Sequence, residues 1–137
     1  MRWMMETDLI ISAIFKGDPN HDLSKRVLKG SRRFILSPYT LMELDLLIRS
    51  GNIEVEDYPA FWSSFEEFLE QYGIELIPME PSHFAEAERI RITYDLSYFD
   101  SLHAAAAMNT GVPLISYDRS YSEIEGLDHL LPSDLTR

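Results

Sequence analysis

The sequence predicts an α/β protein in which helices cover both faces of a parallel sheet. Short apolar runs typical of strands alternate with helical segments along the whole chain, and this alternation is typical of a parallel sheet. None of the apolar runs reaches the length of a membrane span. The chain has 137 residues, of which 45% are hydrophobic, so we expect residues 1–137 to form a single domain.

The first half of the chain contains two strand-like runs, each followed by helical sequence. A strand is predicted at "WMM" (3–5) or up to Glu6, and a helix at 8–17 that Thr7 or Asp8 opens and Gly17 ends. A second helix is predicted at 19–30. The run "RFILS" (33–37) predicts the next strand, and Pro38 and Gly51 mark the start and end of a helix.

The second half continues the alternation. Residues 58–73 predict an amphipathic helix whose aromatic stripe includes Phe61, Trp62, Phe65 and Phe68. Glutamates flank this stripe, so we interpret it as core or as a dimer interface and not as a surface for stacking bases. The remaining predictions are strands at 74–78 and 113–117, helices at 82–96 and 98–111, and a short edge strand at 129–132.

Four acidic residues from distant parts of the chain are predicted to converge at one end of the sheet. Glu6 and Asp118 follow predicted strands, Asp100 lies in the first turn of a helix, and Glu43 lies inside the helix after the second strand. Ligands of such sheets bind beyond the carboxyl ends of the strands. Carboxylates that converge repel one another unless a cation neutralises them. The chain has no cysteine, so oxygen ligands for Mg²⁺ or Mn²⁺ are predicted.

The net charge of −11 argues against sequence-independent adhesion to nucleic acid. Five basic residues nevertheless fall within nine positions, and we predict that they bind RNA: Lys25, Arg26, Lys29, Arg32 and Arg33. The alternative is that they form a solvated helix face. The start "MRWMMETD" is too short and too acidic for a secretory signal, so we expect a cytoplasmic protein without a membrane anchor.

Four sequence segments occur in the order of a known family. "METDLIISAIFKG" places Glu6, Thr7 and Asp8 after an apolar strand, and "SPYTLMELDLL" carries Glu43. "DSLHAAAA" begins at Asp100, and "LISYD" ends at Asp118. With these segments the sequence resembles the PIN-domain ribonucleases, especially the VapC-type toxins of bacterial and archaeal toxin–antitoxin pairs, over almost its whole length.

The resemblance implies a three-layer α/β/α sandwich around a mostly parallel sheet of four or five strands. It also implies a Mg²⁺- or Mn²⁺-dependent endoribonuclease in which Glu6, Glu43, Asp100 and Asp118 are the catalytic metal ligands. The residues that would orient these carboxylates, without being metal ligands themselves, are Thr7, Asp8 and Ser116. The implied partners are an RNA substrate, a second copy of the chain, and an antitoxin whose segment binds in a groove along helix 58–73.

The first motif departs from the family pattern. Most relatives have aspartate where this chain has Glu6, and asparagine or serine where it has Asp8. Either the site shifts slightly, or Asp8 takes over as the ligand, or the metal is held weakly. The alternative function is a catalytically weak or inactive PIN-like module that binds RNA or protein. We interpret His103 as structural and Asp45 as a surface residue.

Overall fold

The central sheet is parallel throughout and has five strands. The computed structural model describes residues 1–136, and its strands lie in the order β3-β2-β1-β4-β5. Their bounds are β1 Arg2–Met5, β2 Arg33–Leu36, β3 Glu75–Leu76, β4 Leu114–Ile115 and β5 His129–Leu130. All neighbouring strands pair in parallel, which confirms the predicted fold class.

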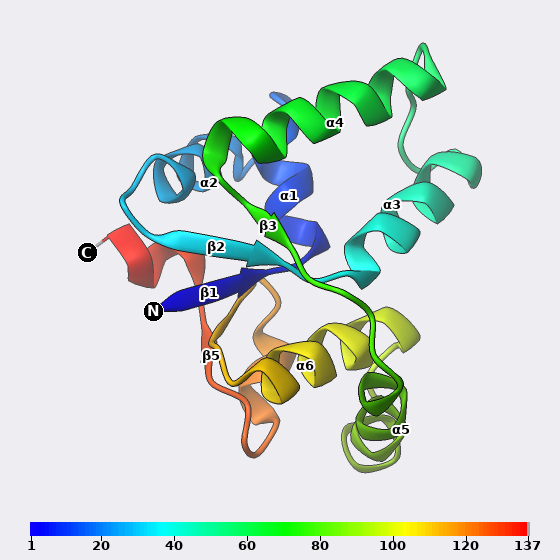
Figure 1. The fold of residues 1–137 in the computed structure, drawn as a ribbon, viewed down its shortest axis with the longest axis vertical. Coiled ribbons are helices and arrows are strands. Elements are labelled where there is room, and N and C mark those ends of the chain that lie inside the picture. The colour runs from blue at the N-terminus through cyan, green and yellow to red at the C-terminus, as the bar shows by residue number, and fades with distance from the viewer. Residues whose placement is uncertain (137) are drawn as a thin grey trace.

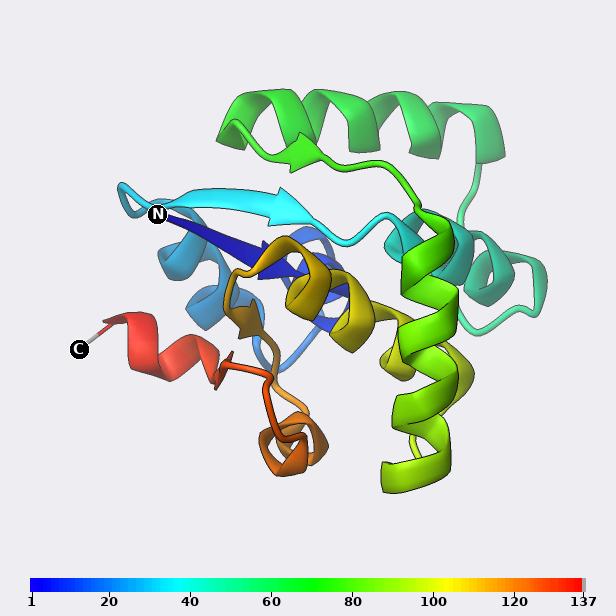
Figure 2. The same ribbon diagram turned by 60° about the horizontal axis from the view of Figure 1, so that its bottom comes forward.

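Helices form a layer on each side of this sheet. The α-helices are α1 Thr7–Ile14, α2 His21–Leu28, α3 Tyr39–Arg49, α4 Tyr58–Tyr72, α5 Pro81–Tyr94 and α6 Tyr98–Thr110. Two short 3₁₀ helices follow β4 and β5, namely η1 Arg119–Glu123 and η2 Pro132–Thr136. Figure 1 shows α1, α2 and α4 on one side of the strands and α5 and α6 on the other, and Figure 2 shows the same layers from a second direction. No helix within residues 1–136 is long and apolar enough to cross a membrane.

The alternation of side chains along the strands explains the two layers. Successive residues of a strand point to opposite faces of the sheet. Met5, Leu36 and Ile115 accordingly belong to one buried cluster, together with residues of α1, α2 and α4. Met4, Ile35 and Leu114 belong to the other, together with residues of α5 and α6 that include Ala104–Ala107. The run of alanines in α6 therefore lies against the sheet, where small side chains allow close packing.

The ends of several elements differ from the sequence prediction. Helix α1 begins at Thr7 and ends at Ile14, three residues before Gly17, and Glu6 is its N-cap because its carboxylate accepts a hydrogen bond from the Asp8 amide. The strand predicted at 74–78 contains only the two residues of β3. Ser97 is the N-cap of α6, since its hydroxyl oxygen accepts from the Asp100 amide at 3.2 Å. Asp100 is therefore not needed as the helix cap.

Candidate functional site

The candidate site lies where the direction of the strand order reverses. The chain moves from β1 to β2 and β3 on one side and then returns to place β4 and β5 on the other. Parallel sheets bind ligands in the crevice that such a reversal leaves beyond the carboxyl ends of the strands. Glu6 directly follows β1, and Ser116 directly follows β4. The topology therefore brings the first and last acidic motifs to the same edge.

Tyr121 joins two of the predicted acids. Its hydroxyl lies 2.8 Å from Glu6 Oε2 and 3.1 Å from Asp100 Oδ1. The Tyr121 side chain is fully buried, and Glu6 is only 4% exposed. The other Glu6 oxygen, Oε1, accepts from the Asp8 amide at 2.6 Å. Both oxygens of Glu6 are thus engaged inside the protein, whereas Asp100 is partly exposed.

Burial and neighbouring charge favour the protonated form of these groups. Burial raises the pKa of Glu6 well above its usual range, and the negative charge of Asp8 adds to that effect. Burial also raises the pKa of Asp100, with a further contribution from the charge of Asp118. Burial and the two adjacent carboxylates raise the pKa of Tyr121 well above its usual range, so its hydroxyl stays a hydrogen-bond donor. The Tyr121 hydroxyl therefore has one proton to donate to two carboxyl groups, those of Glu6 and Asp100.

Glu43 is held by a second set of contacts. Its Oε1 accepts a hydrogen bond from the Thr7 hydroxyl and lies 2.9 Å from His103 Nε2. Because a carboxylate only accepts, Nε2 carries the proton, and Nδ1 of a neutral ring then accepts from the Ser37 hydroxyl at 2.6 Å. Burial alone would raise the pKa of Glu43, but the hydrogen bonds from His103 and Thr7 lower it overall. Glu43 is consequently the acid that the structure keeps ionised and oriented.

Asp8 connects α1 to the end of β4. Its Oδ2 accepts from the Ser116 hydroxyl at 2.7 Å and from the Tyr117 amide at 3.0 Å. Ser116 in turn accepts from the Asp118 amide at 3.0 Å. Asp118 is exposed, and its Oδ1 accepts from the amide and hydroxyl of Ser120 at 2.9 and 2.7 Å. The predicted supporting residues Thr7, Asp8 and Ser116 therefore all lie among the acids.

Two observations show how far these residues fit a divalent cation. The donor chemistry fits, because all four acids offer carboxylate oxygens, and Asp8 Oδ1 is a buried oxygen without a hydrogen-bond partner within residues 1–136. The arrangement does not fit: in the same part of the chain, no three carboxylate or imidazole groups are placed so that they could hold one metal ion. The four acids lie around the same edge of the sheet, and their role as metal ligands remains a prediction.

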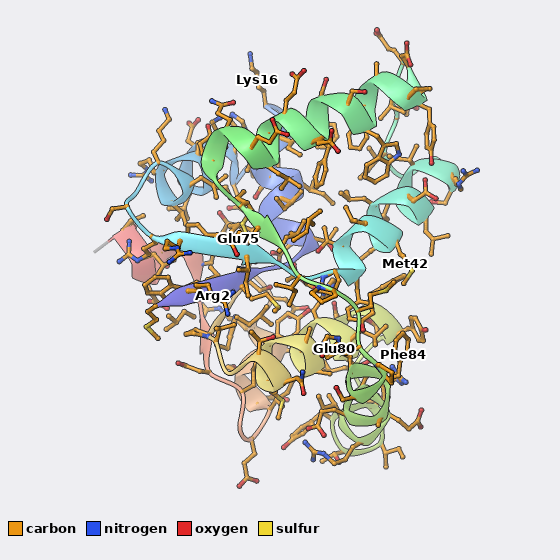
Figure 3. The ribbon with its side chains drawn as sticks, in the orientation of Figure 1. Arg2, Lys16, Met42, Glu75, Glu80 and Phe84 are labelled. Carbon is orange, nitrogen blue, oxygen red and sulfur yellow. The ribbon has the colours of Figure 1, made fainter. Side chains whose placement is uncertain are left out.

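The predicted RNA-binding residues lie at the other end of the sheet. Arg33 starts β2 opposite Arg2, which starts β1, so both are at the amino ends of the strands. Glu75 on β3 lies 3.2 Å from Arg33 Nη2 and 4.0 Å from Arg2 Nη1, and Figure 3 labels Arg2 and Glu75. Arg32 donates to the Leu135 carbonyl at 2.9 Å and lies over the Trp3 ring.

The remaining members of this basic group lie on or next to α2. Lys25 donates to the Tyr72 hydroxyl at 2.5 Å, and its ammonium group lies 4.9 Å from the centre of that ring. Lys25 therefore joins α2 to α4, while Arg26 and Lys29 lie exposed at the carboxyl end of α2. RNA binding by this group remains a prediction, and it concerns a surface separate from the acids.

Sequence reasoning missed two features of the site. Tyr121 is absent from the predicted site, because it lies in a short 3₁₀ segment whose side-chain directions are not specified by sequence periodicity. His103 was interpreted as structural; it is fully buried, as that interpretation expects, but it also orients Glu43. Its position one helical turn after Asp100 was the signal for this second role. Asp45 contacts Arg49 and the Tyr58 hydroxyl, away from the other acids.

Solved structures with a similar fold include three complexes that span nearly the whole chain. VapBC2 from Rickettsia felis, bound to a DNA fragment from its promoter, has a TM-score of 0.73 and 18% identity, over 96% of this chain and 98% of that one. VapBC-1 from nontypeable Haemophilus influenzae has a TM-score of 0.72 and 18% identity, over 97% and 99%. A toxin–antitoxin complex from Klebsiella pneumoniae has a TM-score of 0.66 and 17% identity, over 94% and 96%. At these identities the likeness concerns the fold.

The sequence itself defines the family. The family model described as "PIN domain" matches residues 5–127, which include all four predicted acids. The chain therefore belongs to the PIN domain family. No curated protein matches it at the sequence level.

Proposed function

We propose that this protein is a nuclease that cleaves RNA phosphodiester bonds with the help of Mg²⁺ or Mn²⁺, and that it is the toxin of a toxin–antitoxin pair. The observation that carries the proposal is the convergence of Glu6, Glu43, Asp100 and Asp118 at the reversal of strand order in a PIN fold. Carboxylate oxygens are the donors that these cations prefer. The similar folds of toxin–antitoxin complexes support the biological role.

The residues of the chain have distinct tasks in this proposal. Asp118 is exposed, and Asp100 and Glu43 are partly exposed, so these three acids face the substrate side of the site. Glu43 is held in one orientation by Thr7 and His103, which reduces the reorganisation required when substrate and cation bind. Glu6 is buried and joins the end of β1 to η1 through Tyr121, and Asp8 joins α1 to the end of β4 through Ser116.

Cleavage of RNA by the purified protein tests the proposal. We expect single-stranded RNA to be cut in Mg²⁺ or Mn²⁺ and left intact when a chelator is in excess, because the converging carboxylates need a cation. Products are resolved on a denaturing gel, and restoring the cation after the chelator should restore cleavage. Cleavage that persists in chelator, or RNA that stays intact with every divalent cation tried, would contradict the proposal.

A cavity beside α4 supports an antitoxin as the partner. It has a volume of about 370 Å³ and lies between the α1–α2 segment and α4, with Phe61, Phe65 and Phe68 among its lining residues. Lys16, labelled in Figure 3, and Lys25 also line it, so an apolar segment with acidic flanks suits this groove. We further expect a homodimer and a cytoplasmic location. A neighbouring gene for a DNA-binding protein would favour the toxin role, whereas its absence would favour RNA processing.

The basic residues at the amino ends of the strands provide a separate test of RNA binding. Arg33 has a side chain that is 70% exposed, so Arg33→Gln removes a charge with little effect on the core. If Arg33 contacts a phosphate, the slope of log affinity against log salt should fall by roughly one. The measurement is RNA affinity at several salt concentrations, with Arg89→Gln, at an exposed position on α5, as the control variant. An unchanged slope for Arg33→Gln would assign this residue to ordinary surface.

The hydrogen bonds to both carboxylate oxygens of Glu6 favour a second candidate function. Both of its oxygens already have hydrogen-bond donors, and no three acids within residues 1–136 are placed around one point. A PIN-like module that binds RNA or protein without cleaving it would have these features. Metal affinity separates the two functions, because the nuclease has to bind its cation and the binding module does not.

A further inference from the structure

We infer that the Tyr121 hydroxyl competes with a divalent cation for Glu6 and Asp100, and that Tyr121 thereby sets the metal affinity of this site. The inference rests on the proposed cation-dependent nuclease, but it concerns a residue outside the four predicted acids. The hydroxyl bridges Glu6 Oε2 and Asp100 Oδ1 at 2.8 and 3.1 Å. Tyr121 is thus a positioning residue, not a catalytic one.

Coordination distances explain the competition. A cation of this class binds carboxylate oxygens at about 2.0–2.2 Å, so it would draw Glu6 and Asp100 closer than two hydrogen bonds through an intervening hydroxyl require. The hydroxyl occupies the space between them and directs its proton at the same lone pairs. Hydrogen bonds to ionised groups are among the stronger ones in proteins. Glu6 and Asp100 would therefore have to lose their contacts with the hydroxyl before both could hold the cation.

The surroundings of Tyr121 keep its hydroxyl in place. The side chain is fully buried in the cluster that contains Leu114 and Ile124, and its ring centre lies 5.7 Å from that of His129. The residue also belongs to η1, whose first turn is fixed by Asp118. The ring cannot leave the two acids unless this segment moves.

The test is the affinity for Mn²⁺ alone, measured from the free Mn²⁺ signal in electron paramagnetic resonance and by titration calorimetry. Tyr121→Phe keeps the ring and removes only the hydroxyl, so we expect the dissociation constant to fall about tenfold or more, which corresponds to about 1.4 kcal/mol. Glu6→Asp provides an independent route, because the shorter carboxylate no longer reaches the hydroxyl but keeps its charge. The Glu6→Asp variant should also bind Mn²⁺ more tightly than the wild type. If Tyr121→Phe does not fold, the Mn²⁺ affinity of Glu6→Asp tests whether the hydroxyl competes with the cation.

Two controls distinguish competition from a general loss of packing. Tyr39→Phe removes another fully buried hydroxyl, one that contacts His83 at 2.8 Å instead of a carboxylate, and should leave Mn²⁺ affinity unchanged. The double variant Tyr121→Phe/Glu6→Gln should lose the gain in Mn²⁺ affinity, because the Glu6 carboxylate that the missing hydroxyl leaves free is then replaced by an amide. An equal gain in Tyr39→Phe, or a gain that survives Glu6→Gln, would overturn the inference.

The outcome can be separated from that of the proposed function. If Tyr121→Phe binds Mn²⁺ no more tightly than the wild type, or neither protein binds it, the inference is wrong. If Tyr121→Phe binds Mn²⁺ tightly but cuts no RNA, the inference stands and the proposed substrate is wrong.

Discussion

Asp118→Asn is expected to reduce cation-dependent RNA cleavage by about 100-fold or more, the size of effect that follows loss of one charge-stabilising group from a preorganised site. Asp118 is exposed at the carboxyl end of β4, on the edge where the other acids lie. Asparagine keeps a side-chain oxygen that can accept from the Ser120 amide and hydroxyl, as Asp118 Oδ1 does. The substitution therefore removes charge while it preserves the turn, and cleavage rates under single-turnover conditions measure the effect.

Asp45→Asn is the matched control. Asp45 is a partly exposed aspartate on α3, and it contacts Arg49 and Tyr58 instead of the acids. Cleavage should stay within about twofold of the wild type, because surface ion pairs contribute little even to stability. Equal losses in Asp45→Asn and Asp118→Asn would show that the predicted position of the site is wrong.

The convergence of the acids was predictable because sequence periodicity and strand direction determine it. Once Glu6 and Asp118 are read as residues that follow parallel strands, the geometry of a parallel sheet places both at one edge. Helix end signals were similarly informative: Gly73 and Gly111 end α4 and α6 in left-handed conformations, with φ of 63° and 74°. The aromatic stripe of α4 was also interpreted correctly in part, since Phe65 is buried in the core.

The internal arrangement of the site was not predictable in the same way. Glu6 turns inward to cap α1, because its longer side chain reaches both the Asp8 amide and the Tyr121 hydroxyl. Helical and strand periods do not specify where a side chain of a five-residue 3₁₀ segment points, and Tyr121 belongs to such a segment. The basic residues lie at the opposite edge for a reason that the sequence contains: Arg32 precedes a strand and Arg33 starts it, whereas Glu6 and Asp118 follow strand ends.

The last large effect concerns the stability of the cation-free protein. Glu6→Gln is expected to raise the free energy of unfolding by about 1 kcal/mol or more near neutral pH, which is roughly 3–6 °C in Tm for a chain of this size. Glutamine can accept from the Asp8 amide with its oxygen and donate to the Tyr121 hydroxyl oxygen with its nitrogen. Tyr121 is then free to give its single proton to Asp100. In the wild type, two carboxyl groups share that proton.

The pH dependence of this difference identifies its cause. Because burial raises the pKa of Glu6 in the folded state, the folded protein binds a proton that the unfolded chain has already released. The wild type should therefore lose stability relative to Glu6→Gln as the pH rises from the ordinary range of a glutamate through the raised pKa. Below that range Glu6 is protonated in both the folded and the unfolded protein. The pH-dependent part of the stability difference between the wild type and Glu6→Gln then disappears.

Thermal unfolding in excess chelator between about pH 4.5 and pH 8 measures both effects. Glu66→Gln, a change of the same type at an exposed position on α4, should leave Tm unchanged across the range. A difference between wild type and Glu6→Gln that stays constant with pH would mean that packing, not charge, is responsible. A difference that grows toward acid pH would mean that Glu6 is stabilised as an anion in the folded protein.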